Sequence, residues 1–173
     1  MKEILFFSNN KNKIIEISNF FKNSSIKILS LNDFEKIYSP KETGSTFEEN
    51  AKIKSLYGYK NFKIICFADD SGICINALKG KPGINSKNFL HSTKNERDIL
   101  KKIISIAKLK NNYDAEFHSK ICLTINKNKN VFFEGIVKGK IAKKIAGNEG
   151  FGYDPIFIPM GKKITFAEMN LDE

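Results

Sequence analysis

The chain has 173 residues, of which 41% are hydrophobic and 28% are charged, a composition typical of soluble globular proteins. This length is enough to bury a core without metals or disulfides, so we expect a single domain over residues 1–173. No run is long and apolar enough to cross a bilayer, and the N-terminus turns polar too early for a signal peptide. Membrane-spanning classes are therefore excluded, and the cytoplasm is the expected location.

The formal net charge of +10 suggests a polyanionic partner, either nucleic acid or a phosphate-rich small molecule. The lysines, however, are scattered among asparagines and isoleucines along the chain, and no dense basic patch with interleaved aromatic residues is present. We favour a global bias of composition, with its benefit for solubility, over a nucleic-acid-binding surface as the source of the charge. We therefore do not expect a nucleic-acid partner.

The N-terminal segment predicts a strand over residues 3–8 and a helix that ends at about Lys22, because apolar positions recur there at helical spacing. Between them lies the polar stretch Ser8-Asn9-Asn10-Lys11-Asn12-Lys13. A strand that enters a helix through small polar residues presents backbone N–H groups and the positive end of the helix dipole, which suits a phosphate. A plain polar turn with a surface lysine fits the same residues, and the glycines of a Walker A loop are missing.

The next segment predicts a strand over residues 26–31, then a polar loop and a second helix. A Ser or Thr followed three residues later by Glu occurs twice within residues 45–49, so a capping box is expected there and the helix should run to about Tyr59. Asn50 and Lys54 are one helical turn apart and share a face of this helix.

The central stretch of the chain is an apolar run over residues 64–68 that meets two adjacent carboxylates, Asp69-Asp70, followed by Ser71-Gly72. We expect a buried strand that ends at the acids, the place where open α/β sheets keep their chemistry. Two like charges there are costly unless a cation or hydrogen bonds compensate them, and a divalent metal would supply such a cation. A solvated turn in which Asp70 or Ser71 caps a helix explains the same residues equally well. Glu42, in the polar loop before the second helix, is either a further ligand or an ordinary exposed glutamate.

The second half of the chain predicts a short strand at residues 73–75, an amphipathic helix over 93–109 and an antiparallel hairpin over 115–140. Glycines then alternate with aromatic residues over 147–157. Such a loop lets the backbone approach a ligand closely while rings stack on a nucleobase. A tight turn with its rings in the core is the alternative.

The acids at 42, 69 and 70 and the lysines at 13 and 54 suit one reaction when they are taken together. Acids hold Mg²⁺, Mg²⁺ and lysines neutralise a polyphosphate, and a carboxylate activates water for in-line attack at phosphorus. The sequence therefore predicts nucleotide hydrolysis.

At this point the sequence resembles the inosine triphosphate pyrophosphatase family, which hydrolyses deaminated purine nucleoside triphosphates such as ITP, dITP and XTP. The resemblance implies an α/β fold with an elongated central mixed sheet flanked by helices, two lobes with an active-site cleft between them, Mg²⁺ as cofactor and a homodimer. The matching blocks fall in the family's order over nearly the whole chain: Ser8-Asn9-Asn10 with Lys13, Glu42-Thr43-Gly44, Thr46-Phe47, Glu49-Asn50-Ala51 with Lys54, Ala68-Asp69-Asp70-Ser71-Gly72, Gly80 with Pro82-Gly83 and Ser86, Gly150-Phe151-Gly152-Tyr153-Asp154-Pro155-Ile156-Phe157, and Ala167-Glu168.

The resemblance also implies roles for individual residues. Asp70 would accept the proton from water and bind the metal together with Glu42, Asp69 would support that site, and the products would be a nucleoside monophosphate and pyrophosphate. The implied catalytic residues are Asp70, Asp69, Lys13 and Lys54; those for the triphosphate are Ser8, Asn9, Asn10, Lys11, Asn12, Lys13, Lys54 and Ser71; those for base and sugar are Phe151, Gly152, Tyr153 and Asp154.

Two departures from the family pattern concern recognition of the base. The chain has Ser86-Lys87-Asn88 where the family has Ser-Ala-Arg, and it stops at Glu173, before the expected Ser-His-Arg segment. We therefore expect either the family's preference for deaminated purines or the same fold with broad or reduced activity. A basic nucleic-acid-binding protein that has lost catalysis is the rival from another class.

Overall fold

The computed structural model describes residues 2–34 and 38–170, which form two compact units. Unit 1 consists of the residues up to Asp70 together with Ser119–Glu134, and unit 2 consists of Ser71–His118 together with the residues from Gly135 onward. The strands belong to a six-stranded sheet with the order β2-β1-β3-β4-β5-β6. Parallel and antiparallel pairs both occur in it, which confirms the predicted α/β class with a mixed sheet.

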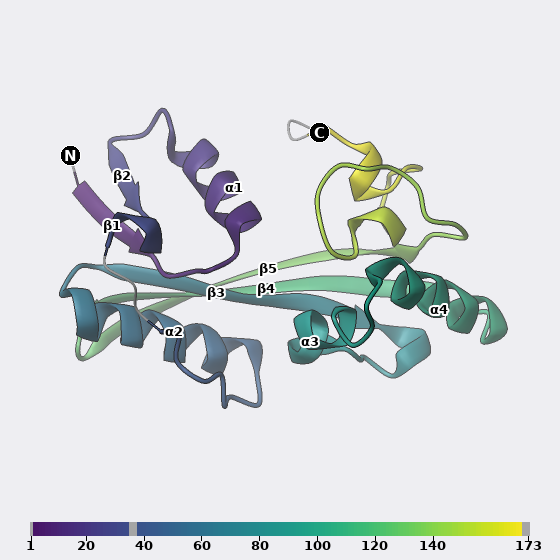
Figure 1. Ribbon diagram of the computed structural model, residues 1–173, viewed down its shortest axis with the longest axis horizontal. Coiled ribbons are helices and arrows are strands. Elements are labelled where there is room, and N and C mark those ends of the chain that lie inside the picture. The colour runs from purple at the N-terminus through teal and green to yellow at the C-terminus, as the bar shows by residue number, and fades with distance from the viewer. Residues whose placement is uncertain (1, 35–37, 171–173) are drawn as a thin grey trace. The chain divides into compact units, whose positions relative to one another are not determined.

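Unit 1 begins with two βα segments. Strand β1 (Lys2–Phe6) pairs in parallel with β2 (Ile26–Leu29) and with β3 (Cys66–Ile75). Helices α1 (Lys11–Phe21) and α2 (Phe47–Phe62) lie on opposite sides of β3 (Figure 1). Apolar residues of α2, among them Tyr57 and Phe62, pack against a small core formed by Leu5, Phe7, Leu29, Cys66 and Ala68.

Helix α2 begins where the sequence predicts, whereas α1 begins at Lys11, inside the polar stretch that was expected to precede it. Asn10 caps α1, and Thr46 caps α2 by accepting a hydrogen bond from the Glu49 N–H at 3.1 Å. The Glu49 carboxylate in turn accepts from the Ser45 N–H at 2.6 Å. Helix α2 continues three residues beyond the predicted Tyr59 and stops where Lys63 adopts the left-handed conformation with a φ of 57°.

Strand β3 contradicts one prediction directly. It runs without interruption from Cys66 to Ile75, so Asp69 and Asp70 lie in its middle and neither end a strand nor form a turn or helix cap. The strand continues between its sheet neighbours β1 and β4, and its Ile73 N–H donates to Ser86 Oγ at 2.9 Å, an acceptor 13 residues later in the sequence. Gly72 makes this approach possible, since a Cβ atom there would overlap Gly83 and Ser86.

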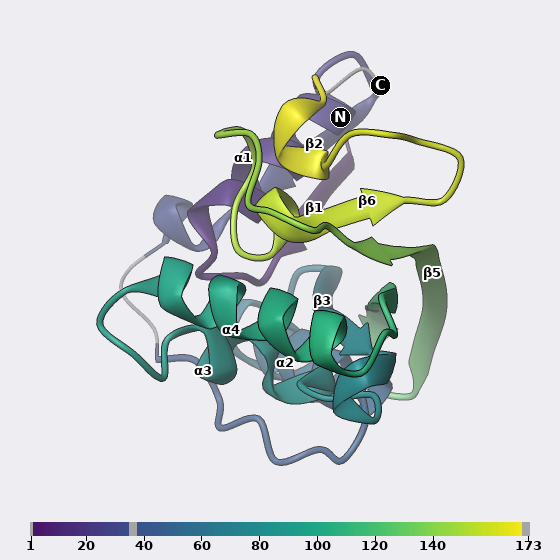
Figure 2. The same ribbon diagram turned by 90° about the vertical axis from the view of Figure 1, so that its right-hand side faces the viewer.

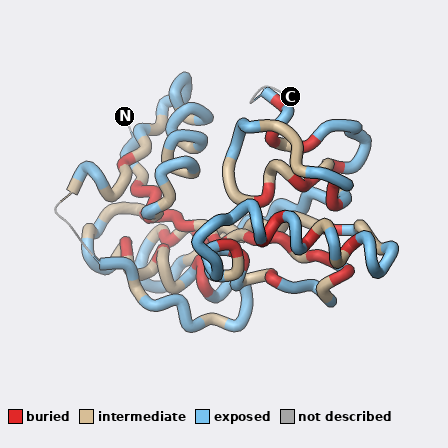
Figure 3. Tube along the Cα trace, turned by 45° about the vertical axis from the view of Figure 1, so that its right-hand side comes forward, coloured by how far each residue is buried: buried red, intermediate tan, exposed pale blue. Residues whose placement is uncertain are grey.

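Unit 2 contains α3 (Ser86–Leu90), α4 (Glu96–Leu109) and the short strand β6 (Phe157–Pro159). Strand β6 pairs antiparallel with the last residues of β5 (Figure 2). Strands β4 (Asp114–Asn126) and β5 (Lys129–Ile141) are sheet neighbours joined by two residues, which confirms the predicted hairpin. Buried positions recur every three or four residues along α4, giving the alternating red turns in Figure 3 and the predicted amphipathic helix.

Within the described residues, no helix has the length and the apolar character that crossing a membrane would require.

Candidate active site

One lysine of unit 1 joins two of the predicted acids. The Lys54 Nζ atom lies 3.2 Å from Glu42 Oε1 and 3.3 Å from Asp70 Oδ1. Lys54 comes from α2, Asp70 from β3 and Glu42 from the loop that precedes α2. The side chains of Lys54 and Asp70 are only 14% and 10% exposed, whereas Glu42 is 44% exposed. The structure therefore brings together three residues that are up to 28 positions apart in the sequence.

Asn50 belongs to the same cluster, although sequence reasoning gave it no role. Its side chain is buried, and its Nδ2 donates to Asp70 Oδ2 at 3.1 Å. Its Oδ1 accepts from the Gly44 N–H at 2.8 Å. The signal in the sequence was the shared helix face of Asn50 and Lys54, but a polar pair at that spacing is also typical of a solvated surface.

The environment of Asp70 makes its carboxylate more basic than that of an exposed aspartate. Burial, which removes water from the charged form, raises the pKa of Asp70 above its ordinary value. The nearby Lys54 charge and the hydrogen bond from Asn50 lower the pKa, and the negative charge of Glu42 raises it, but burial dominates. A raised pKa improves a carboxylate as a proton acceptor near neutral pH.

Asp69 has a different cation partner. Its Oδ2 atom forms an ion pair with the Nζ atom of Lys13, from α1. Neighbouring residues of a strand point to opposite faces, so Asp69 and Asp70 meet lysines from helices on opposite sides of β3 (Figure 1). Each of the two acids therefore has a lysine of its own as a compensating cation. Burial raises the pKa of the nearby Glu16, which the charge of Lys13 lowers and that of Asp69 raises further.

The predicted phosphate loop leads into the start of α1. Asn10 Oδ1 accepts hydrogen bonds from the N–H groups of Asn12 and Lys13 at 3.0 and 3.3 Å, and the Asn10 N–H donates to Ser8 Oγ at 3.2 Å. Two of the amides expected to meet a phosphate are thus bonded to the cap of the helix. The exposed side chains of the loop are Asn9, Lys11 and Asn12.

The residues predicted to hold base and sugar belong to unit 2. Tyr153 is buried, and its hydroxyl donates to the Ser86 carbonyl at 2.7 Å. Asp154 Oδ2 accepts a hydrogen bond from the Phe151 N–H at 2.7 Å, so this carboxylate stabilises the loop to which it belongs. Gly152, with a φ of 67°, provides the left-handed turn. Ser71 lies in β3 at the start of unit 2, half-buried.

The predicted metal ligands are Glu42 and Asp70, whose oxygen atoms are hard donors suited to Mg²⁺. In the part of the chain that the structure describes, no group of three or more His, Cys, Asp or Glu side chains could hold a metal ion. Mg²⁺ is commonly bound by one or two carboxylates together with substrate phosphates and water. Because Glu42 and Asp70 already share one cation, Lys54, this donor set fits a metal that arrives with a nucleotide.

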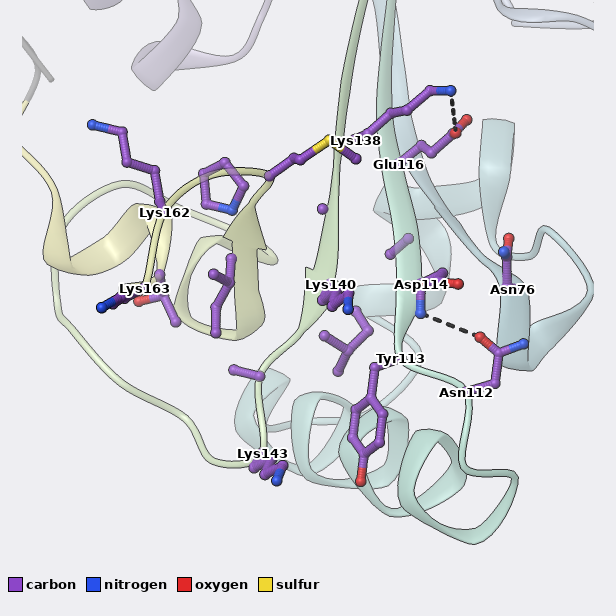
Figure 4. Close-up of a pocket in the computed structure, with 18 of the residues that line it drawn as sticks. Asn76, Asn112, Tyr113, Asp114, Glu116, Lys138, Lys140, Lys143, Lys162 and Lys163 are labelled. Atoms are coloured by element: carbon purple, nitrogen blue, oxygen red, sulfur yellow. Dashed lines mark hydrogen bonds and ion pairs between the residues drawn. The ribbon is translucent and has the colours of Figure 1, made fainter.

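A hollow of about 1530 Å³ in unit 2 is lined by none of the predicted site residues. Several lysines surround it, but they come from different elements, and Lys138 and Lys162 point away from each other (Figure 4). Lys138 lies 3.9 Å from Glu116. Because these charges do not converge on one point, we assign this hollow no ligand.

Comparisons with known proteins agree over nearly the full length of the chain. The model of the Ham1 family matches residues 4–173. The dITP/XTP pyrophosphatase of Flavobacterium psychrophilum is 44% identical over 171 residues, which cover 99% of this chain and 89% of the relative. The enzyme of that name from Acholeplasma laidlawii is 38% identical, with 96% and 82% covered.

Solved structures agree with the fold as well. The structure of a HAM1 protein from Coxiella burnetii has a TM-score of 0.86 at 33% identity and covers 98% of this chain and 88% of its own. The Ham1 protein of Staphylococcus aureus has a TM-score of 0.82 at 33% identity, with 98% and 87% covered.

Proposed function

Because the chain belongs to the Ham1 family, we propose that residues 1–173 form one catalytic domain, a pyrophosphatase for deaminated purine nucleoside triphosphates. The substrates would be ITP, dITP and XTP, which the enzyme removes from the nucleotide pool. Relatives that match nearly the whole chain are named dITP/XTP pyrophosphatase. The observation in this chain that carries the proposal is the cluster of Glu42, Asn50, Lys54 and Asp70.

Asp70 is the proposed general base. It accepts a proton from a water molecule whose oxygen attacks the α-phosphorus. The bond between this phosphorus and the oxygen that bridges to the β-phosphorus breaks, so that pyrophosphate leaves with the electron pair and a nucleoside monophosphate remains. The raised pKa of Asp70 favours this proton transfer, because the carboxylate takes up a proton more readily than an exposed aspartate does.

Lys13 and Lys54 are the proposed phosphate-binding cations. Without a substrate, each ammonium group is paired with carboxylates of the site, Lys13 with Asp69 and Lys54 with Glu42 and Asp70. A triphosphate carries charges that these ammonium groups can contact in place of the acids. When the lysines change partner from carboxylate to phosphate, they remain paired with negative charge. The carboxylate oxygens are released when the substrate binds.

Mg²⁺ is the proposed cofactor, with Glu42 and Asp70 as the residues that would hold it. When bound, it supplies positive charge that stabilises the negative charge developing on the phosphates. Among the other predicted residues, Ser8–Lys13 and Ser71 would contact the triphosphate. Phe151 remains a half-buried ring for the base, whereas Tyr153 supports the loop through Ser86.

The proposed activity is tested by measuring pyrophosphate release from dITP, XTP, dATP and dGTP, each with Mg²⁺ and with EDTA. We expect Mg²⁺-dependent hydrolysis with a higher kcat/KM for dITP and XTP than for dATP. Equal kcat/KM values for all four would instead indicate the broad-specificity alternative, in line with the missing arginine after Ser86. Absence of metal-dependent hydrolysis of any triphosphate would refute the proposal.

A homodimer in the cytoplasm is the further part of this proposal. Strand β5 leaves Phe133 and Val137, which share one face of the strand, 53% and 41% exposed, and exposed apolar side chains of this kind occur at protein interfaces. We expect light scattering after size-exclusion chromatography to give twice the mass of the chain at micromolar concentration. A mass equal to that of one chain would contradict the dimer.

A further inference from the structure

The side chain of Asn50 uses both ends of its amide inside the proposed site. The Nδ2 atom donates to Asp70 Oδ2 at 3.1 Å, and the Oδ1 atom accepts from the Gly44 N–H at 2.8 Å. Asn50 itself is only 3% exposed. A buried amide is retained at such a position when its groups are paired, because an unpaired polar group there is costly.

The bond to Asp70 fixes one oxygen of the proposed base. Lys54 contacts the other oxygen, Oδ1, at 3.3 Å. The two oxygens of the carboxylate therefore have different partners. Oδ2 is bonded to an uncharged amide that no phosphate would displace, and Oδ1 contacts a lysine that a phosphate can attract. Asn50 holds the orientation of the carboxylate when Lys54 changes partner.

The bond to Gly44 fixes the loop that carries Glu42, two residues earlier in the sequence. The approach is close, since a Cβ atom on Gly44 would lie 2.7 Å from Asn50 Oδ1 and 2.6 Å from the Cβ of Glu49. A glycine is thus needed for the loop to reach the helix. One buried side chain links the two elements that supply the proposed metal ligands.

We propose that Asn50 is a positioning residue, which sets the Asp70 carboxylate and the Glu42 loop in one arrangement before metal and substrate bind. This inference rests on the proposed function and adds to it a residue that acts through Asp70 and not on the substrate. Partners of this kind, which orient a metal-binding carboxylate, typically change activity by about 10- to 100-fold when they are removed.

Two substitutions separate the two hydrogen bonds. Asn50→Asp keeps an oxygen that can accept from Gly44 and loses the donor to Asp70, whereas Asn50→Leu has a similar volume and loses both. The matched control is Asn61→Ala on the same helix, where an exposed asparagine donates to the Tyr57 carbonyl at 2.7 Å. Each variant is measured for kcat and KM with dITP at saturating Mg²⁺, for hydrogen exchange of the Gly44 amide and for melting temperature.

We expect both Asn50 variants to lose about 10- to 100-fold in kcat while KM changes less than about threefold, because the lost interaction orients the base and does not bind the substrate. The Gly44 amide should exchange faster in Asn50→Leu and stay protected in Asn50→Asp. A folded Asn50→Asp with the kcat of the wild type, or a loss seen in KM alone, would overturn the inference. If the wild type and Asn61→Ala hydrolyse no triphosphate, the proposed function has failed, and the exchange of Gly44 still decides whether Asn50 anchors the loop.

Discussion

Replacing Asp70 with asparagine is expected to lower kcat for dITP by at least about 10³-fold, because the variant loses its proposed proton acceptor and a metal ligand together. The shape of the site should change little. Asparagine has the size of aspartate, and its Oδ1 can still accept the hydrogen bond from Asn50. Pyrophosphate release at saturating Mg²⁺ and dITP measures the effect.

The same variant is expected to be at least as stable as the wild type. Burial raises the pKa of Asp70, so the fold favours the protonated, uncharged form over the carboxylate. The contribution of Asp70 to stability is therefore fully present at pH values below the pKa that Asp70 has in the unfolded chain. It is lost as the pH rises through the higher pKa that Asp70 has in the folded state. The asparagine side chain cannot ionise, so the advantage of Asp70→Asn should be absent in acid and grow toward neutral pH.

Urea unfolding in EDTA, measured from acid to neutral pH, tests the expected stability of Asp70→Asn, with Glu3→Gln as the control variant. Glu3 is a half-exposed acid of β1 that pairs with Lys27 at 2.9 Å, away from the residues of the site. The control should keep its activity. An inactive Asp70→Asn that is also less stable at pH 7 would show that the loss of activity comes from the fold, and would contradict the assignment of Asp70 as base.

Gly72→Ala is expected to destabilise unit 2 by about 3 kcal/mol, since added atoms in a packed site force the backbone apart. The new Cβ would overlap the Gly83 carbonyl oxygen and Ser86 Oγ. Ser86 Oγ is also the acceptor for the Ile73 N–H at 2.9 Å and the donor to Gly83 at 2.6 Å. The methyl group would therefore disturb two buried hydrogen bonds as well as the packing.

Gly135→Ala is the matched control for this effect. Gly135 also lies in a strand, but a Cβ there would have no atom within 4 Å. We expect its unfolding free energy to stay within about 1 kcal/mol of the wild type. Urea midpoints of the three proteins measure the difference, and a midpoint for Gly72→Ala equal to that of Gly135→Ala would mean that β3 and Ser86 do not approach as described.

Regular elements could be predicted because their signals are local. The 3.6-residue period of α4 and the alternation along β4 lie within the elements themselves, and the cap Thr46 lies directly before α2. The course of β3 could not be predicted. Ser71 and Gly72 lie in a strand whose partners are distant in the sequence, β4 in the sheet and Ser86, 13 residues after Ile73, and no local pattern records them.

The residues of the proposed site also divide into those that the sequence indicates and those that it does not. Glu42, Lys54 and Asp70 could be selected because charged residues beside strand and helix signals are conspicuous, and the structure brings them together. Asn50 was not selected because its importance comes from burial and from two partners, 6 and 20 residues away. That Asp69 and Asp70 pair with different lysines follows from the strand continuing through them, which the sequence did not indicate.

The limits of the two units fall inside strands. Residue 70 lies within β3, residue 118 within β4 and residue 134 within β5. A cut or an exchange of segments at any of these positions would break a hydrogen-bonded strand, whereas the turn at residues 127–128 lies between strands. Neither unit is therefore a module that recombination could move by itself, and inserted tags or circular permutation belong at that turn.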